Sequence, residues 1–358
     1  MNDAGGRAQG SAYMQFAKLK AAAKYGLASS GVADAGMAEI APEPHDLVLN
    51  DPSPYGWPPL VETIAARFRV DPACVVVPGG GCSFANHLAM AAIIRPGDTV
   101  VIEDPGYELL TSTAIFLGAR VLPFTRRFSE DWRIDPAAAS VTPDVSVVVM
   151  SNLHNPSGAL AAPEDVAALA AVAPTLLIDE VYFELTFGEA LARTAFSEDG
   201  NIVVTSSLTK AYGLSGLRCG WILAPRALAE RMRRLNDLFG VKAPHVAERL
   251  AVRAFARLPA LRDRAAALIE PNRAAYQEIL AGHPALEQTI FDQGTTVFPR
   301  LRHGYGDAFF RRLTERFETS LAPGSFFGAR DHIRIGLGGD PAMTREGLTR
   351  IAEALQLA

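Results

Sequence analysis

The chain has 358 residues, of which 49% are hydrophobic and 20% are charged. This balance allows a sizeable core and excludes a disordered chain. The formal net charge is −5 and no long basic run occurs, which argues against nucleic acid and membrane surfaces as main partners. Three scattered cysteines give neither a disulfide framework nor zinc spacing. The chain shows no signal-peptide core and no apolar run of the about 20 residues that span a membrane, so we expect a cytoplasmic protein.

The first part of the chain, residues 1–44, is expected to form an N-terminal arm. Ser11 is placed to cap a helix that runs from Tyr13 to about Tyr25. A loop rich in serine, glycine and proline follows, from Ser29 to Trp57. This loop is a candidate for one wall of a substrate pocket.

Short β-rich runs and helical stretches alternate through the middle of the chain. Continuous apolar runs separated by helices predict a mostly parallel sheet with helices on both faces. Only about a dozen residues separate the last two runs, too few for a helical crossover, so this pair is expected to be antiparallel. The seven expected strands are Cys74–Val77, Thr99–Glu103, Arg120–Phe124, Val145–Met150, Thr175–Ile178, Ile202–Ser206 and Cys219–Leu223.

From about Arg226 the pattern becomes helical, and Pro259 and Pro271 are expected to break it into segments. The tail adds two strands and a closing helix, at Thr295–Leu301, His332–Leu337 and Thr344–Leu355. We therefore predict an α/β fold with a large domain, residues 45–245, and a smaller α+β domain, residues 246–358.

A glycine-rich turn after the first strand is a candidate phosphate cup. Gly81, Cys82 and Ser83 open the next helix, whose free N–H groups and partial positive charge favour an anion. The spacing is neither the dinucleotide fingerprint nor a Walker loop. A glycine-rich turn without a ligand is the equally open alternative.

Other polar residues follow the predicted strands at the edge of the sheet where ligands bind in parallel folds. Lys210 lies between apolar strands, so desolvation should lower its pKa and make the amine nucleophilic. Ser207 and Arg218 flank it and are suited to a phosphate. Tyr107 could stack on a flat ligand, Asn155 could hydrogen-bond an oxygen, and Asp179 needs a buried cationic partner.

These motifs resemble those of fold-type I pyridoxal 5′-phosphate (PLP) enzymes, the aspartate aminotransferase superfamily. Ser207-x-x-Lys210 is followed by Arg218 after eight residues, and Asp179-x-x-Tyr182 and Asn155-Pro-Ser-Gly precede it in the family's order. The resemblance runs from about Pro54 to Leu337. In length and around Lys210 the chain looks most like the histidinol-phosphate aminotransferase and threonine-phosphate decarboxylase branch.

The resemblance implies a role for each residue. Lys210 would hold the cofactor as a Schiff base and move the proton, Asp179 would pair with the pyridine nitrogen, and Tyr107 would stack on the ring; these three are the expected catalytic residues. Arg334 would clamp the substrate carboxylate, together with Asn155. The full set expected to bind the cofactor is Gly81, Cys82, Ser83, Tyr107, Asn155, Asp179, Tyr182, Ser207, Lys210 and Arg218.

The leading hypothesis is an aminotransferase that moves an amino group from an amino acid to a 2-oxo acid. A lyase, decarboxylase or cyclase reaction on the same scaffold remains open, as does a PLP-binding regulatory module, although no basic N-terminal region supports the last. The resemblance also implies a homodimer, in which Tyr55 is a candidate for reaching the neighbouring subunit's phosphate.

Further expectations concern histidine, glutamate and arginine residues outside this set. The seven histidines show no ligand pair, so no metal site is expected. His154 is a candidate for substrate contact, although a solvated turn residue is the more common case. Glu180 is expected to cap the next helix, and Arg126, Arg127 and Arg133 to form a solvated basic cluster.

Overall fold

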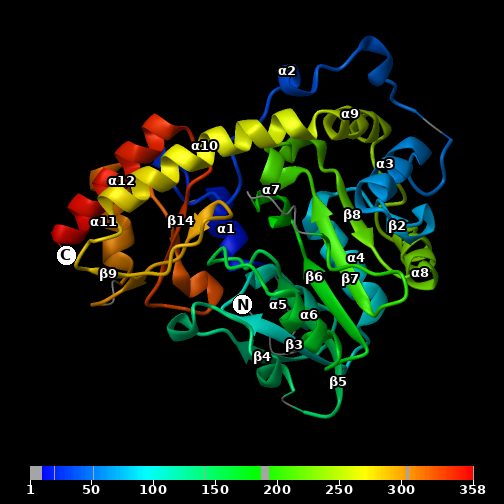
Figure 1. Cartoon of the computed structure of the whole chain (residues 1–358), viewed down its shortest axis with the longest axis horizontal. Helices are drawn as coiled ribbons and strands as arrows, with labels where there is room; N and C mark the ends of the chain where they lie inside the picture. Colours follow the sequence, from blue (N-terminus) through cyan, green and yellow to red (C-terminus); the bar gives the residue numbers. More distant parts are fainter. Residues whose placement is uncertain are drawn as a thin grey trace.

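A seven-stranded sheet forms the centre of the computed structural model, which describes residues 10–19, 21–50, 52–140, 142–186, 193–303 and 306–357 (Figure 1). Residues 1–9 of the expected arm lie outside this described part. The strand order is β2-β8-β7-β6-β5-β3-β4. The strands are β2 (Val75–Val76), β3 (Thr99–Asp104), β4 (Arg120–Thr125), β5 (Val145–Ser151), β6 (Thr175–Asp179), β7 (Ile202–Ser207) and β8 (Gly220–Leu223).

The pairing directions in this sheet follow from the length of the connections. The strands β4, β3, β5, β6 and β7 pair in parallel. The short connection from β7 to β8 leaves no room for a helical crossover, and β8 pairs antiparallel with both β7 and β2. The predicted α/β sheet with an antiparallel last pair is therefore confirmed.

Alternate residues of each strand face opposite layers of helices. On one face, Val147 and Val149 of β5 pack in a core with α4 (Gly81–Ile93), α5 (Glu108–Phe116) and α8 (Arg226–Asn236). On the other face, Val148 and Met150 join a core with helices α3 (Pro58–Phe68), α6 (Pro163–Ala170) and α9 (His245–Ala256). Side chains on both faces explain why the strands read as continuous apolar runs.

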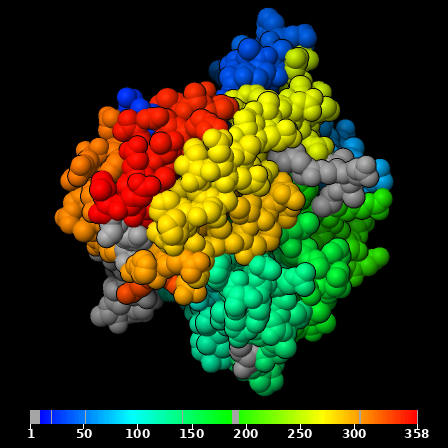
Figure 2. Space-filling view, turned by 60° about the vertical axis from the view of Figure 1, so that its left-hand side comes forward, coloured from blue at the N-terminus to red at the C-terminus, as the bar shows by residue number. Residues whose placement is uncertain are grey.

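A second, smaller layer contains short strands and the last helices. The strand β14 (Ile333–Gly336) lies between β10 (Thr296–Val297) and β13 (Ala322–Pro323). The long helix α10 (Leu258–Ile279) packs along α12 (Pro341–Gln356), and the two lie side by side on the surface in Figure 2. The other elements are β9 (Leu286–Glu287), β11 (Arg300–Leu301), α11 (Asp307–Phe317) and β12 (Thr319–Ser320).

The N-terminal arm packs against both layers. Its elements are α1 (Ala12–Leu19), β1 (Tyr25–Gly26) and α2 (Met37–Ile40), and β1 pairs in parallel with β12. The small core contains Tyr25 and Leu27 together with residues from α10 to α12. The first half of α10 packs in the large core and the second half in the small one. The division at residues 44 and 245 stays a prediction.

Two expectations about helix ends are wrong. The helix α1 ends at Leu19 instead of near Tyr25, because the Ala21 N–H turns back to the Phe16 carbonyl and Tyr25 enters a strand. Pro271 does not break α10, since buried neighbours such as Ile269 and Ala275 hold the helix on both sides of it. The expected cap of α1 is confirmed: Ser11 Oγ accepts the Met14 N–H at 3.0 Å.

No helix within the described residues is long and apolar enough to cross a membrane.

Candidate active site

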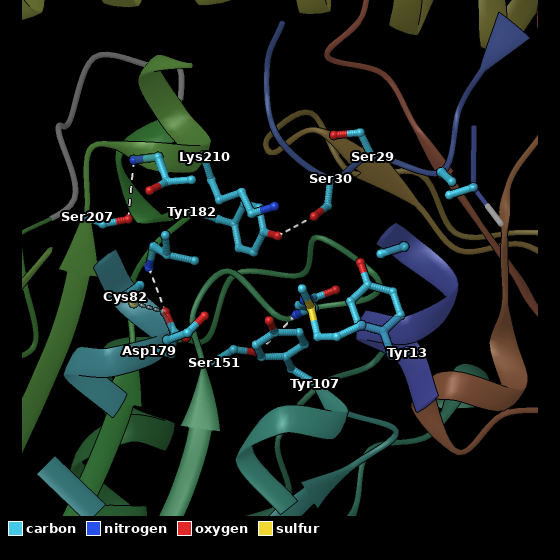
Figure 3. Close-up of a pocket in the computed structure, with 18 of the residues that line it drawn as sticks. Tyr13, Ser29, Ser30, Cys82, Tyr107, Ser151, Asp179, Tyr182, Ser207 and Lys210 are labelled. Carbon is cyan, nitrogen blue, oxygen red and sulfur yellow. Dashed lines mark hydrogen bonds between the residues drawn. The ribbon is translucent and has the colours of Figure 1, made fainter. Parts of the chain in front are cut away.

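A cavity of about 530 Å³ opens at the carboxyl ends of the parallel strands, where the arm covers the sheet (Figure 3). Its walls combine polar residues of the sheet with residues of α1 and the segment after it. Nine of the predicted site residues line it: Cys82, Ser83, Tyr107, Asn155, Asp179, Tyr182, Ser207, Lys210 and Arg218. The remaining two, Gly81 and Arg334, lie directly behind this wall through contacts with Arg218 and Asn155.

Lys210 projects into the cavity from α7 (Thr209–Tyr212), the short helix that follows β7. The arm fixes this helix, because the Val32 N–H donates to the Lys210 carbonyl at 3.0 Å. Burial lowers the pKa of the Lys210 amine, and the charges of Arg334 and Arg218 act in the same direction against Tyr13 and Asp179. A lower pKa leaves more of the amine neutral, and therefore nucleophilic, near neutral pH.

Asp179 ends β6 and is held by hydrogen bonds on both oxygens. Its Oδ1 accepts from the Val181 N–H at 3.0 Å and from the Cys82 thiol at 3.3 Å, and Oδ2 accepts from Asn86 Nδ2 at 2.7 Å. Thr205 in turn fixes the Asn86 amide by donating to its Oδ1 at 2.5 Å. Burial raises the pKa of this carboxyl, so a cationic partner would be needed to keep it ionised.

The glycine turn and the start of α4 form an open cup beside Arg218. Gly81 has a φ of +73°, and a Cβ built there would lie 2.8 Å from Arg218 Nη2. The Gly81 N–H donates to the Arg218 carbonyl at 2.8 Å, and Arg218 Nη2 donates to the Gly80 carbonyl at 2.6 Å. Only glycine leaves space for the guanidinium here, beside the start of α4.

Arg334 lies on β14, fully buried, with hydrogen bonds to three different segments. Its Nη1 donates to Asn155 Oδ1 at 2.9 Å. Its Nη2 donates to the Tyr13 hydroxyl at 2.7 Å and to the Ala28 carbonyl at 2.9 Å, while Nε has no partner. The guanidinium thus links the sheet, the arm and the small layer at one edge of the cavity.

A chain of buried hydrogen bonds reaches Asn155 from the sheet. Ser151 Oγ accepts from the Asn155 N–H at 2.9 Å and donates to Glu103 at 2.5 Å. Glu103 is paired with Arg126 at 3.0 Å, both side chains being at most 1% exposed. The expectation that Arg126 belongs to a solvated cluster is therefore wrong. Arg126 faces the same side as buried Phe124, whereas Arg127 and Arg133 are exposed.

The aromatic residues of the cavity lie between the sheet and the arm. The Tyr182 hydroxyl donates to Ser30 Oγ at 2.6 Å, and these groups point toward Lys210 in Figure 3. Tyr107 directly precedes α5 and makes an edge-on contact with the Tyr13 ring at 6.0 Å between centroids. Burial raises the pKa of both Tyr107 and Tyr182, so both hydroxyls are neutral at ordinary pH.

Two residues have other roles than the sequence predicts. His154 does not line the cavity and is not solvated: it is buried, with Nδ1 2.6 Å from Ser157 Oγ and Nε2 2.8 Å from the Pro105 carbonyl. Glu180 caps no helix, because its carboxylate accepts the Ala195 N–H at 2.8 Å.

Tyr55 is 43% exposed, with its hydroxyl 3.4 Å from Asp237, and its role at a neighbouring subunit stays a prediction.

Sequence reasoning missed Tyr13, Asn86 and the apolar lining of the arm. The predicted helix included Tyr13, but its partner Arg334 is 321 residues away. Asn86 had a detectable signal, since it follows Cys82 by one helical turn and therefore shares its face of α4.

Among the described residues no cluster of metal-binding side chains occurs.

The residues around the cavity fit the groups of PLP. The cup with Arg218 and the start of α4 matches a phosphate, buried Asp179 matches a protonated pyridine nitrogen, and Lys210 can bind an aldehyde carbon. The space that Gly81 leaves beside Arg218 supports this fit independently of activity.

Comparisons with known proteins agree with this chemistry. The model of the family "Aminotransferase class I and II" matches residues 47–354. Capreomycidine synthase of Streptomyces vinaceus is 30% identical over 93% of this chain and 90% of its own. The arginine–pyruvate transaminase of Pseudomonas aeruginosa is 32% identical over 78% of this chain and 73% of its own.

A solved structure extends the likeness to the whole fold. The PLP-dependent cyclase OrfR superposes with a TM-score of 0.84 at 29% identity, over 92% of each chain. Histidinol-phosphate aminotransferases are also among the relatives, such as that of Cereibacter sphaeroides at 31% identity over 51% of each chain. The resemblance predicted from the motifs is confirmed, and the cofactor that this family and fold imply is PLP.

Proposed function

Because the chain belongs to the class I and II aminotransferases, we propose that it transfers the amino group of an amino acid to a 2-oxo acid. The observation that carries this proposal is the shared cavity of Lys210, Asp179 and Asn155, with Arg334 bonded to Asn155. A half-buried amine and a buried carboxylate then line one cavity, and the arginine proposed to bind the substrate carboxylate lies directly behind its wall.

The proposed roles follow from these positions. Arg218 and the start of α4 bind the cofactor phosphate, and Asp179 pairs with the pyridine nitrogen. When bound, PLP supplies an electron sink for the charge left at the substrate Cα. Arg334 and Asn155 hold the substrate carboxylate, which fixes the direction of the Cα–H bond. Lys210, with its pKa lowered by burial, then accepts the Cα proton on Nζ.

The likeness to capreomycidine synthase and to the cyclase OrfR favours a second candidate, a cyclase reaction on the same scaffold. Both reactions begin by removing the Cα proton, so the residues above serve either one. The two differ in the fate of the amino group, which would leave the substrate in transamination and would stay with the product in cyclisation.

The experiment is a visible spectrum of the purified holoenzyme with single amino acids and no added 2-oxo acid. Conversion of the cofactor to its amine form with stoichiometric 2-oxo acid supports transamination. Release of ammonia, carbon dioxide or a cyclised product with an unchanged cofactor spectrum would replace this proposal by the lyase, decarboxylase or cyclase alternative. Lys210→Ala should lower turnover more than about 100-fold, whereas the exposed Lys18→Ala should not.

We also propose a cytoplasmic location and a homodimer, and the exposed apolar surface supports the homodimer. Large apolar side chains are exposed around the end of α8, among them Leu238, Phe239 and Val241. Exposed Tyr55 lies beside them through its contact with Asp237. A second copy of the chain would remove this surface from water, and sedimentation of the holoenzyme tests that arrangement.

A further inference from the structure

We propose that the amino acid substrate has an uncharged side chain, which lies against an apolar wall formed by the arm. This inference rests on the proposed function and adds the substrate class to it. The arm wall is defined by the cavity-lining residues of α1 and the segment that follows: Met14, Ala17, Ala21, Ala22, Ala23 and Gly26.

The arm wall lies at the substrate end of the cavity. The cofactor end is formed by Asp179, Arg218 and the start of α4, which belong to the large sheet layer. Arg334, expected to bind the substrate carboxylate, contacts the arm at Tyr13 and Ala28. A side chain that leaves a Cα held between Lys210 and Arg334 therefore has the arm as its neighbour.

The arm wall is held in place from several directions. Ser320 Oγ donates to the Ala21 carbonyl at 2.6 Å, which fixes the turn after α1 against β12. Tyr13 and Phe16 of α1 pack on Phe326, with ring centroids 5.9 and 5.0 Å apart. Ser11 at the start of α1 donates to Glu108 of α5. The wall is therefore a built surface between both layers, and its small side chains leave the cavity open.

The charges that line the cavity are taken by the cofactor. Of the described residues that line the cavity, three have an Asp, Glu, Lys or Arg side chain: Asp179, Lys210 and Arg218. Each of the three faces a part of PLP in the proposed function. Burial raises the pKa of Cys82, which stays neutral like Tyr107 and Tyr182. No opposite charge on the described wall is left to pair with a charged substrate side chain.

The energetic consequence favours neutral side chains. Moving an unpaired charge out of water is unfavourable. An apolar side chain instead gains free energy in proportion to the surface that it removes from water. Moving a neutral polar side chain out of water costs less free energy than moving a charged one. A comparison of side chains of nearly equal shape therefore isolates the effect of charge.

The test compares amino acids of nearly equal shape that differ in charge: glutamine with glutamate, citrulline with arginine, and norleucine with lysine. Single-turnover reaction of the holoenzyme should favour the neutral member of each pair at least about tenfold in rate constant over dissociation constant, a difference of 1.4 kcal/mol. Calorimetric binding of the α-methyl forms, which lack the Cα hydrogen, should show the same ranking without turnover.

A variant of the arm wall locates the side chain. Ala17 is exposed on α1 and lines the cavity, and Ala17→Asp should raise reaction with arginine relative to citrulline several-fold. Ala17→Asn, equal in shape but neutral, is the control and should leave that ratio unchanged. An unchanged ratio in Ala17→Asp overturns the placement on the arm wall.

The outcomes also separate this inference from the proposed function. Preference of the wild-type enzyme for glutamate, arginine or lysine over the neutral partner, with transamination proceeding, overturns the inference and leaves the proposed function standing. Tighter binding of the neutral α-methyl forms than of the charged ones, without conversion of the cofactor by any amino acid, removes the proposed function and leaves the ranking of side chains standing.

Discussion

The hydroxyl of Tyr13 lies 2.7 Å from Nη2 of Arg334, so one donor of the expected carboxylate clamp is already engaged by the arm. The second terminal nitrogen donates to Asn155. A substrate carboxylate that binds both nitrogens in the forked geometry typical of arginine must compete with the Tyr13 hydroxyl. Binding at Arg334 is therefore coupled to the position of α1.

Tyr13→Phe removes this competitor and should tighten the binding of carboxylate ligands. A hydrogen bond to a charged group is worth about 1.5–3 kcal/mol, so we expect the dissociation constant of an α-methyl amino acid to fall roughly tenfold. Calorimetric titration of the holoenzyme measures this change. Weaker binding in Tyr13→Phe would instead mean that the hydroxyl is itself a ligand of the substrate.

The pH dependence gives a second test of Tyr13. Burial raises the pKa of its hydroxyl, but the charges of Arg334 and Lys210 and two hydrogen bonds outweigh burial and bring the pKa below 10.0. The phenolate holds Arg334 more strongly than the neutral hydroxyl, so carboxylate affinity should fall as the pH rises toward that pKa. Tyr13→Phe should flatten this alkaline decline, and an equally steep decline in the variant would contradict the coupling.

Gly81→Ala should weaken the binding of PLP. Its φ of +73° disfavours a side chain. The added Cβ would lie 2.8 Å from Arg218 Nη2 and would therefore displace the guanidinium. Gly97 has a φ of +90° but nothing within 4 Å of an added Cβ, so Gly97→Ala is a control for backbone strain alone. We expect both variants to lose about 1–2 kcal/mol of stability, and the PLP dissociation constant to rise only in Gly81→Ala. Equal PLP affinities would exclude a role of the cup in phosphate binding.

Glu103→Gln should destabilise the fold through Arg126. The amide keeps an oxygen for Ser151 but removes the charge that compensates the buried guanidinium 3.0 Å away. Breaking such a pair costs about 3–5 kcal/mol. Glu130→Gln, which breaks the exposed pair with Arg127, should cost less than about 1 kcal/mol. Urea unfolding of both variants measures the difference, and equal losses would show that the buried pair adds nothing.

The fold and the sheet side of the site were predictable because their signals are local. Apolar runs between helices fixed the strand positions, and parallel strands bring their carboxyl ends, with Asp179 and Lys210, to one edge. The arm side was not predictable in the same way. Tyr13 meets Arg334 across 321 residues, and Arg126 meets Glu103 on a neighbouring strand, so neither partner is visible in a local pattern. A run of arginines looks solvated until the facing direction of each strand residue is known.

Glu180 provides a pH-dependent test of the buried carboxylates beside the site. Burial raises its pKa from 4.5 to about 7 in the folded chain, so the folded state favours the protonated form. The stabilising contribution is present below 4.5 and is lost as the pH rises through about 7. Each pH unit of that interval is worth about 1.4 kcal/mol, which gives a loss on the order of 3 kcal/mol. Glu180→Gln keeps an oxygen for the Ala195 N–H and should therefore match wild type in urea unfolding near pH 4.5 but exceed it at pH 8. The exposed Glu164→Gln should show no such divergence, and parallel stabilities of Glu180→Gln and wild type across this range would mean that folding does not raise the pKa of Glu180.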